Sequence, residues 1–463
     1  MLIQISSEYD LSHNIWLRDH CRCPSCYHPK TKQRLLNTFA ISPKIRPISV
    51  EATNEGLQIL WPLEHSSDPS HPEHSSSSSS SESAHDSHAA LYPWKWLRMN
   101  SYAPPLHQTH SESITYQEEI AGPGKTLWGS GIAAHPPSVG YEEVMKDDRG
   151  VWNWLEKISQ YGFSFVDNVP PTPEATEELI RRIAFIRETH YGGFWDFTSD
   201  LSHGDTAYTD LALGAHTDTT YFTDPAGLQL FHLLSHEAST DGAAPSGGAS
   251  LLVDGFLAAK VLKDVHPEAY DVLSTVRIST HSAGDENTFV SPLLKAGYPI
   301  LQHDFDPAAA AAAPISDLDA QLQTHTASSS HAPPHSHGKL VMVRYNNDDR
   351  SVLSLPESLV EPFYSALNKW HSILTSSEGE YWQQLTPGRC LIFDNHRVLH
   401  GRSAFVGQRR LCGGYVSGDD YRSRLEVLKK RYGGSVGSGS GSVSGRVGEK
   451  EGPLPRSVWD EGL

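Results

Sequence analysis

Two short stretches of the sequence contain residues whose types and spacing could bind one metal ion. The stretch GAHTD provides His216 and Asp218, and the distant stretch DNHRVLHG provides His400. Side chains two residues apart on an extended strand point to the same face, so His216 and Asp218 could contact the same ion. His400 from another strand would complete a set of two histidines and one carboxylate. Such a set leaves coordination positions open and is typical of Fe(II).

Two further residues could hold an anionic ligand beside this ion. Arg409 follows His400 by a few residues and could bind the distal carboxylate of 2-oxoglutarate through a bidentate, charge-assisted pair. Ser250, which follows two glycines at the start of a strand-like run, could donate a hydrogen bond to the same carboxylate. The alternative interpretation places both histidines in the core and Arg409 on the surface. Residue types alone do not decide between the two interpretations.

The cysteines predict a second metal site. Three of the five lie close together as Cys21, Cys23 and Cys26. An odd number of cysteines with one dense cluster indicates reduced thiols and a metal site in an intracellular protein, not a disulfide framework. Cys390 and Cys412 lie inside apolar runs, and we expect them to be core residues.

Short strand-like runs are the main pattern around the first set of residues. A helical pattern at 151–160 ends at Gly162, and Thr172 with Pro173 predicts a second helix that reaches about Arg187. The apolar runs that follow predict strands at 211–215, 228–234, 250–253, 340–345, 390–393 and 411–415. Many short strands with few helices predict a double-sheet jelly roll flanked by helices, in preference to a parallel βαβ fold.

Two low-complexity inserts interrupt the chain, one at about residues 66–90 and one at about residues 307–337. The end of the chain from residue 433 is rich in glycine and serine. All three segments lack the apolar residues that would offset the entropy of ordering, so we expect mobile loops and a flexible tail.

Composition and charge exclude several classes of protein. The formal net charge of -18 argues against binding to a phosphate backbone and is compatible with a cationic small molecule. The sequence has no apolar run of about 18 residues, which predicts no membrane span. Its beginning has no signal or transit pattern, so we predict a cytoplasmic protein, or a mitochondrial one if a targeting segment is missing from this sequence.

Several longer stretches resemble the trimethyllysine dioxygenase and γ-butyrobetaine dioxygenase family, which belongs to a larger taurine-dioxygenase-like group. These stretches are WLRDHCRCPSC, GAHTDTTYF, GGASLLVDGF, VRYNNDDRS, FDNHRVLHGRSAF and GQRRLCGGY. The resemblance implies that His216, Asp218 and His400 bind iron and that Arg409 anchors 2-oxoglutarate.

The same resemblance implies a structural zinc ion in the N-terminal region. Members of this family carry three closely spaced cysteines and one later histidine, and Cys21, Cys23 and Cys26 match the three thiolates. For the fourth ligand, His65 fits the residues upstream of it and His88 fits the spacing to the residues downstream. We prefer His65. Three thiolates and one imidazole form a closed tetrahedral set, which is typical of a structural site.

A substrate pocket follows from the resemblance as well. Aromatic faces attract a trimethylammonium group by cation–π interaction. The positions that match this pocket are Tyr191, Trp195, Tyr208 and Tyr415. Asp205 stands where the γ-butyrobetaine enzyme has Asn, and a carboxylate there suits a substrate with an additional α-ammonium group. Asn346 and Asn347 are weaker candidates for the rest of the headgroup pocket.

Taken with this family, the predicted fold is mainly β with flanking helices. It consists of a small N-terminal zinc-binding β domain and a double-stranded β-helix (jelly roll) catalytic domain. The predicted boundaries are residues 1–105 for the zinc-binding domain, 106–140 for a connector, 141–432 for the dioxygenase domain and 433–463 for the flexible tail.

The implied reaction is hydroxylation of trimethyllysine at C3, coupled to oxidative decarboxylation of 2-oxoglutarate to succinate and CO2, as the first step of carnitine biosynthesis. It uses Fe(II), 2-oxoglutarate and O2, and ascorbate keeps the iron ferrous. The alternatives are γ-butyrobetaine as substrate, a non-enzymatic methyl-lysine-binding module, and a histone demethylase, which the absence of a basic or chromatin-binding segment disfavours. We expect a small-molecule substrate and neither nucleic acid nor membrane as partner. The oligomeric state stays open, with a homodimer among the expectations.

Overall fold

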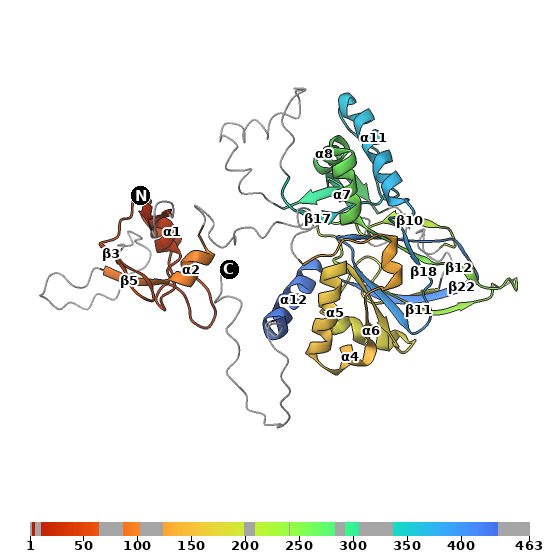
Figure 1. Cartoon of the computed structure of the whole chain (residues 1–463), viewed down its shortest axis with the longest axis horizontal. Coiled ribbons are helices and arrows are strands. Elements are labelled where there is room, and N and C mark those ends of the chain that lie inside the picture. Colours follow the sequence, from red (N-terminus) through yellow and green to blue (C-terminus); the bar gives the residue numbers. More distant parts are fainter. Residues whose placement is uncertain are drawn as a thin grey trace, which may run out of the picture. The chain divides into compact units, whose positions relative to one another are not determined.

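The computed structural model describes residues 2–4, 11–63, 87–101, 124–198, 209–239, 241–282, 292–304 and 337–433. These residues form two compact units, one that ends at Ser101 and one from Gly124 to Gly433 (Figure 1). The predicted boundary at residue 105 and nearly all of the predicted tail lie outside the described residues. In the part of the chain that is described, no helix is long and apolar enough to cross a membrane.

The N-terminal unit is built around a three-stranded antiparallel sheet in the order β3-β4-β5. In the central strand, every second residue (Leu57, Ile59 and Trp61) points to the same face and is buried, as expected of a strand covered on one side. The elements are β1 (Leu2–Gln4), β2 (Leu11–His13), α1 (Asn14–Asp19), the 3-10 helix η1 (Thr38–Ala40), β3 (Ser49–Ala52), β4 (Gly56–Pro62), β5 (Ser87–Pro93) and α2 (Trp94–Met99). Because β5 begins at Ser87, residues 87–90 belong to a strand and not to the predicted insert.

The larger unit contains two main sheets and, among the described residues, three further sheets of two strands each. Its strands are β6 (Ser138–Gly140), β7 (Phe163–Asp167), β8 (Ile186–Arg187), β9 (Trp195–Thr198), β10 (Leu213–His216), β11 (Leu228–Glu237), β12 (Ser246–Gly247), β13 (Ser250–Asp254), β14 (Ile278–His281), β15 (Leu293–Tyr298), β16 (Leu301–His303), β17 (Leu340–Val343), β18 (Tyr381–Gln383), β19 (Arg389–Asp394), β20 (Val398–Arg402), β21 (Phe405–Val406) and β22 (Gln408–Val416). Its helices are η2 (Ser130–Ala134), α4 (Tyr141–Lys146), α5 (Asp148–Tyr161), α6 (Pro173–Arg181), α7 (Gly255–Val265), α8 (Pro267–Thr275), α11 (Glu357–Leu374) and α12 (Gly418–Tyr432).

The first sheet has the order β6-β7-β19-β11-β22-β8, with β9 also paired to β22, and the second has the order β10-β20-β13-β18. A buried cluster joins their inner faces, with Phe163 and Phe393 from the first sheet against Leu252, Tyr381 and Val398 from the second. Two sheets that share one apolar core in this way form the predicted double-stranded β-helix, and the expectation of a mainly β fold is confirmed.

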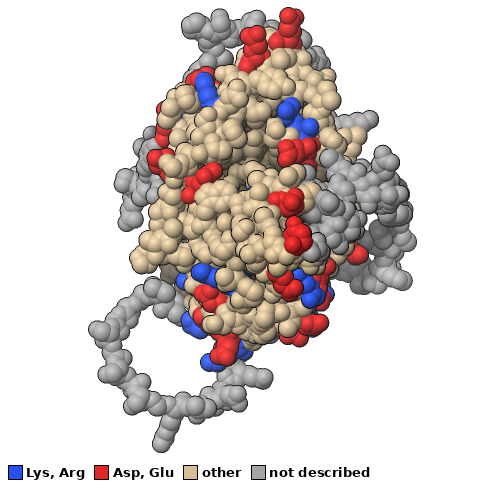
Figure 2. All heavy atoms as spheres, turned by 90° about the vertical axis from the view of Figure 1, so that its right-hand side faces the viewer, with Lys and Arg blue, Asp and Glu red and all other residues tan. Residues whose placement is uncertain are grey.

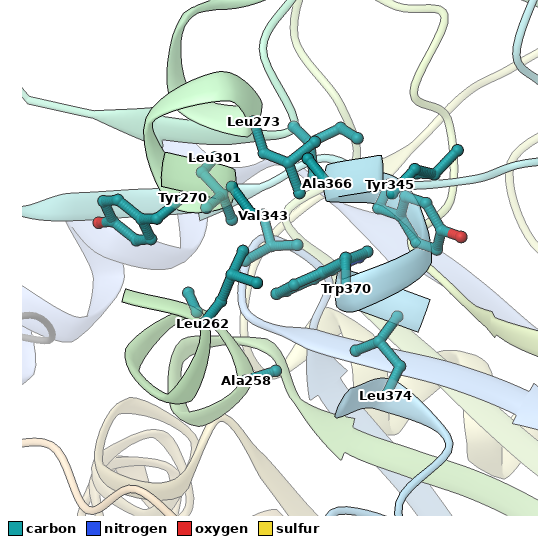
Figure 3. Packing of buried hydrophobic residues seen from close by; sticks show 14 of the residues in the cluster. Ala258, Leu262, Tyr270, Leu273, Leu301, Val343, Tyr345, Ala366, Trp370 and Leu374 are labelled. Atoms are coloured by element: carbon teal, nitrogen blue, oxygen red, sulfur yellow. The ribbon is translucent and has the colours of Figure 1, made fainter. Parts of the chain in front are cut away.

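Helices cover the outer face of each sheet. Trp154, Leu155 and Ile158 of α5 pack with Ile392 of β19 in a core that α4, α6 and α12 extend. On the other side, α7, α8 and α11 pack on the second sheet, and Trp370 of α11 lies in the core between them (Figure 3). On the face shown in Figure 2, the visible Lys and Arg side chains are scattered among Asp and Glu and form no continuous basic patch.

One predicted helix end is confirmed and another differs. Helix α5 ends at Tyr161, and Gly162 follows it with a φ of 79°, the left-handed conformation that favours glycine, as predicted. Helix α6 ends at Arg181 and not near Arg187, because Ile186 and Arg187 form β8 and pair with β22. Helices α7, α8, α11 and α12 lie between or after the predicted strands, in stretches for which we predicted no helix.

Candidate active site and metal centres

The two histidines and the aspartate of the predicted triad lie together inside the jelly roll. His216 at the end of β10 and His400 in β20 are cross-strand partners, and their ring centroids are 4.3 Å apart. Oδ1 of Asp218 lies 3.4 Å from Nε2 of His216 and 3.7 Å from Nε2 of His400. Adjacent ligands of an octahedral ion at about 2.1 Å are roughly 3 Å apart, so the three atoms are arranged as neighbouring ligands on one face.

The backbone around Asp218 is fixed by Asn395. The Asn395 side chain accepts a hydrogen bond from the Asp218 N–H (2.7 Å) and donates to the carbonyl groups of Asp218 (3.0 Å) and Ala226 (2.9 Å). Thr219, the next residue, has a φ of 57°, and its hydroxyl accepts from the Ala226 N–H (2.8 Å). These bonds hold the sharp turn that aims the Asp218 carboxylate at the histidines.

The ionisation of two of the three residues, His400 and Asp218, suits metal binding. Burial lowers the pKa of His400 to about 3, so that the ring is neutral and its Nε2 lone pair is available. Burial alone would raise the pKa of Asp218, but the two histidines and Tyr415 outweigh it and hold the pKa well below its usual range. For His216, the hydrogen bond and charge of Asp218 outweigh burial and raise the pKa.

A buried guanidinium lies in the same cavity. Arg409 is 1% exposed, and its Nε and Nη1 atoms have no hydrogen-bond partner among the described residues. A Cβ atom on Gly248 would lie 3.0 Å from Cζ of Arg409, so the glycine provides the space that this group occupies. Burial, together with the neighbouring Arg402, lowers the pKa of Arg409 to about 10. A buried cation with free donors fits an anionic ligand, and Ser250 lines the same cavity.

The cavity also contains most of the residues predicted to contact the substrate. Tyr191, Trp195 and Tyr415 line it, and the rings of Trp195 and Tyr415 meet edge to face at 6.2 Å. Asn346 is among its lining residues, whereas Asn347 is not. Asp205 and Tyr208 lie outside the described residues.

Six polar residues of the cavity were not predicted as site residues: Thr219, Tyr221, Gln229, Asp348, Asp349 and Arg402. Tyr221 places its hydroxyl 3.4 Å from that of Tyr191. Gln229 carried a local signal, because it is a buried polar residue within the apolar run of β11. The two aspartates had no such signal, since a polar loop is their usual location.

The three N-terminal cysteines form a compact cluster with a histidine. Nε2 of His88 lies 3.3 Å from Sγ of Cys21 and 3.5 Å from Sγ of both Cys23 and Cys26. Sulfur ligands at about 2.3 Å and nitrogen at about 2.1 Å give tetrahedral edges of roughly 3.6 Å, so this spacing fits zinc. His65, the preferred fourth ligand of the sequence analysis, lies outside the described residues.

The cluster has a buried cation beside it. Nη1 of Arg18 lies 3.3 Å from Sγ of Cys26. A hydrogen bond from Cys21, assisted by Arg18, lowers the pKa of Cys26 to about 5. The lowered pKa favours the thiolate form of Cys26, whereas the same hydrogen bond, together with burial, raises the pKa of Cys21.

Comparison with known proteins decides the family. The profile of the taurine catabolism dioxygenase TauD, TfdA family matches residues 123–415. The chain belongs to the TauD/TfdA dioxygenase family. A second profile, gamma-butyrobetaine hydroxylase-like, N-terminal, matches residues 6–68.

Full-length relatives of this TauD/TfdA dioxygenase are found in fungi and animals. Trimethyllysine dioxygenase of Neurospora crassa is 41% identical, over 89% of this chain and 79% of that protein. The human protein named trimethyllysine dioxygenase, mitochondrial, is 36% identical, over 89% of this chain and 82% of that protein. Human gamma-butyrobetaine dioxygenase is 25% identical, over 93% of this chain and 94% of that protein.

Iron and 2-oxoglutarate, the cofactors of such a dioxygenase, fit the residues present. The triad offers three ligand atoms within 4.8 Å of one another, and Arg409 offers unpaired donors to a carboxylate in the same cavity.

Proposed function

We propose that this dioxygenase hydroxylates free trimethyllysine at C3. One hydrogen of the substrate is replaced by hydroxyl, while 2-oxoglutarate and O2 are converted to succinate and CO2. The observation that carries the choice of substrate is the comparison within one organism. The chain is 36% identical to the human trimethyllysine enzyme but only 25% identical to the human γ-butyrobetaine enzyme.

In this proposal His216, Asp218 and His400 hold Fe(II), which supplies the site for O2 activation. Arg409 binds the distal carboxylate of 2-oxoglutarate, and Ser250 donates to the same group. The support is the geometry of the triad and the unpaired donors of the buried Arg409 in one cavity.

The substrate is held by its two charged ends. Tyr191, Trp195, Tyr208 and Tyr415 surround the trimethylammonium group, and Asp205 pairs with the α-ammonium. Support comes from the aromatic lining of the cavity, although Asp205 and Tyr208 lie outside the described residues. Asp348 and Asp349 line the same cavity as Arg402 and Arg409, so carboxylates for a cationic group and guanidinium groups for an anionic one are both present.

The N-terminal cluster holds a structural zinc ion in this proposal. We assign Cys21, Cys23, Cys26 and His88 as its ligands and replace our earlier preference for His65, because His88 Nε2 contacts all three sulfur atoms. Ascorbate keeps the iron ferrous. We further propose a homodimer, in the cytoplasm or, as the name of the human relative states for that protein, in mitochondria.

The test is succinate release by the purified chain with Fe(II), 2-oxoglutarate and ascorbate. Trimethyllysine should stimulate release strongly, and γ-butyrobetaine should stimulate it weakly. Stimulation by γ-butyrobetaine alone would assign the sister activity. A chain that binds trimethyllysine but turns over no 2-oxoglutarate would be a binding module.

A further inference from the structure

We infer that Gln229 and Tyr415 are positioning residues that hold Asp218 as a ligand through one oxygen only. Tyr415 does so with the side chain that also lines the substrate cavity. The inference rests on the proposed function, because it concerns the geometry of the iron site. It changes the expected role of Tyr415, which the sequence predicts only as an aromatic wall of the substrate pocket.

The two oxygen atoms of Asp218 have different surroundings. Oδ1 faces the metal-binding nitrogens of His216 and His400, at 3.4 and 3.7 Å. Oδ2 accepts two hydrogen bonds, one from Nε2 of Gln229 (2.7 Å) and one from the hydroxyl of Tyr415 (2.7 Å). Both are short bonds to an ionised carboxylate, which are the stronger kind in proteins. With its lone pairs so engaged, Oδ2 is turned away from the ion, and Asp218 occupies a single coordination position.

Both donors come from neighbouring strands at the centre of the seven-stranded sheet. Gln229 of β11 and Tyr415 of β22 are direct cross-strand partners, and Nε2 of Gln229 lies 3.4 Å from the Tyr415 hydroxyl. Side chains at directly opposite positions share one face of the sheet. Asp218 instead follows β10 of the four-stranded sheet. The pair therefore connects the two sheets at the triad.

The two donor groups are buried and both bond to Asp218. Gln229 is 2% exposed and Tyr415 is 5% exposed, so each donor needs a partner to offset its lost hydration, and Oδ2 of Asp218 is that partner. Oε1 of Gln229 has no hydrogen-bond partner among the described residues. The Gln229 amide must point its nitrogen to Asp218, since the reverse orientation would place two acceptors in contact. A Leu at 229 or a Phe at 415 would suit these apolar strands better if the carboxylate did not require the donors.

The consequence for the site is the number of free positions. A carboxylate that binds through both oxygens would occupy one more position of an octahedral ion than a carboxylate that binds through one. The facial arrangement needs three open positions, two for 2-oxoglutarate and one for O2. Second-layer hydrogen bonds of this kind typically change metal affinity or activity by about 10- to 100-fold.

Tyr415→Phe separates the two roles of this side chain. The variant keeps the aromatic face for the trimethylammonium group and removes the donor to Asp218. We expect its dissociation constant for Fe(II) to rise about tenfold. We also expect a shifted or weakened charge-transfer absorption band when Fe(II) and 2-oxoglutarate are added without O2. Turnover should release more succinate per hydroxylated product, while the Michaelis constant for trimethyllysine changes little.

Gln229→Leu is the second variant. It keeps the approximate size of the side chain and removes the other donor to Asp218. We expect the same change in the charge-transfer band as in Tyr415→Phe. Tyr421→Phe is the matched control, because Tyr421 is also 5% exposed but lies in α12 and packs on the helical side of the large sheet. It should leave Fe(II) affinity and the absorption band unchanged. Circular dichroism and the melting temperature show whether each variant is folded.

The outcomes separate this inference from the proposed function. If the unmodified chain gives no charge-transfer band with Fe(II) and 2-oxoglutarate, the iron site itself is wrong. If it gives the band, and Tyr415→Phe and Gln229→Leu both match it in Fe(II) affinity and in spectrum, the two residues do not position Asp218. A raised Michaelis constant for trimethyllysine in Tyr415→Phe with unchanged Fe(II) affinity would also overturn the inference, because it would give the hydroxyl a role toward the substrate alone.

Discussion

The two groups of candidate metal ligands differ in how many ligands they offer and in where those ligands come from. The N-terminal cluster presents three sulfur atoms and one nitrogen, which satisfy a tetrahedral ion completely. The triad in the jelly roll presents two nitrogens and one oxygen, which leave half of an octahedral ion free. A closed set can only stabilise the fold around it. An open set can bind reactants, and it lies in the cavity that also contains Arg409 and the aromatic residues.

The supporting residues follow the same division. Beside the N-terminal cluster, Arg18 contacts Cys26 and neutralises part of its charge. Around the triad, Asn395, Gln229 and Tyr415 fix the orientation of Asp218 and add no further ligand. The first kind of support favours binding of the ion, and the second keeps positions on the ion available.

The largest loss of activity is expected from substitutions that remove a ligand of the open site. His216→Ala, Asp218→Ala and His400→Ala should each reduce trimethyllysine-dependent succinate release to background, because each removes one of only three protein ligands. The zinc content and the melting temperature should change little. Substantial remaining turnover in any of the three variants would contradict the assignment of the triad.

Removing a ligand of the closed site should instead lower stability and leave activity largely unchanged. Cys23→Ser should lower zinc content and the melting temperature together, since a structural ion contributes folding free energy directly. Activity per folded molecule should be largely kept. Elemental analysis and thermal unfolding test this, and an unchanged zinc stoichiometry would mean that the cluster is not the site. His88→Ala should reproduce the effect, and His65→Ala should not.

A smaller effect is expected at the anion-binding end of the open site. Gly248→Ala places a Cβ atom 3.0 Å from Cζ of Arg409, so the guanidinium must move. We expect the dissociation constant for 2-oxoglutarate to rise about tenfold, which corresponds to roughly 1.4 kcal/mol.

Gly124→Ala is the control for the backbone of that variant. Gly124 has a φ of 76°, close to the 72° of Gly248, but no atom of the described residues lies within 4 Å of its Cβ position. Both substitutions carry the strain of a left-handed alanine. If they weaken 2-oxoglutarate binding equally, or if neither does, contact with Arg409 is not the reason for the glycine.

Local patterns in the sequence indicate best those residues that lie close together along the chain. His216 and Asp218 are two residues apart, although only His216 lies in β10 and Asp218 follows it in a turn, and His400 lies on the strand that pairs with β10. Local patterns indicate less where the pairing of distant strands determines which residues meet. Nothing local distinguishes His88 from His65 across a low-complexity insert. The register of β4 and β5 is what places His88, because it puts this residue opposite Trp61 in the sheet beside the cysteines.

The missed elements have a similar cause. Helix α11 was not predicted, although Phe363, Ala366, Trp370 and Leu374 follow a helical spacing that faces α7 and α8 (Figure 3). The pattern is disguised by Pro362 inside the helix and by exposed apolar residues such as Tyr364. Likewise, the hydrogen bonds of Gln229 and Tyr415 depend on Asp218 from the opposite sheet, which no spacing along the chain indicates.

The smallest expected effect concerns the choice between the two sister substrates, and it rests on Asp205. A carboxylate that faces an α-ammonium forms a charge-assisted bond, worth about twice a neutral one. Asp205→Asn keeps the shape and removes the charge, so the Michaelis constant for trimethyllysine should rise roughly fivefold, equivalent to a loss of about 1 kcal/mol. Decarboxylation of 2-oxoglutarate without substrate does not depend on this contact and should stay the same. Activity on γ-butyrobetaine, which has no α-ammonium, should hold or improve. If the kinetics with trimethyllysine match those of the parent, Asp205 does not contact the headgroup. The negative charge that favours the additional α-ammonium of trimethyllysine would then have to come from other residues, and beyond the metal ligand Asp348 and Asp349 are the described carboxylates that line the cavity.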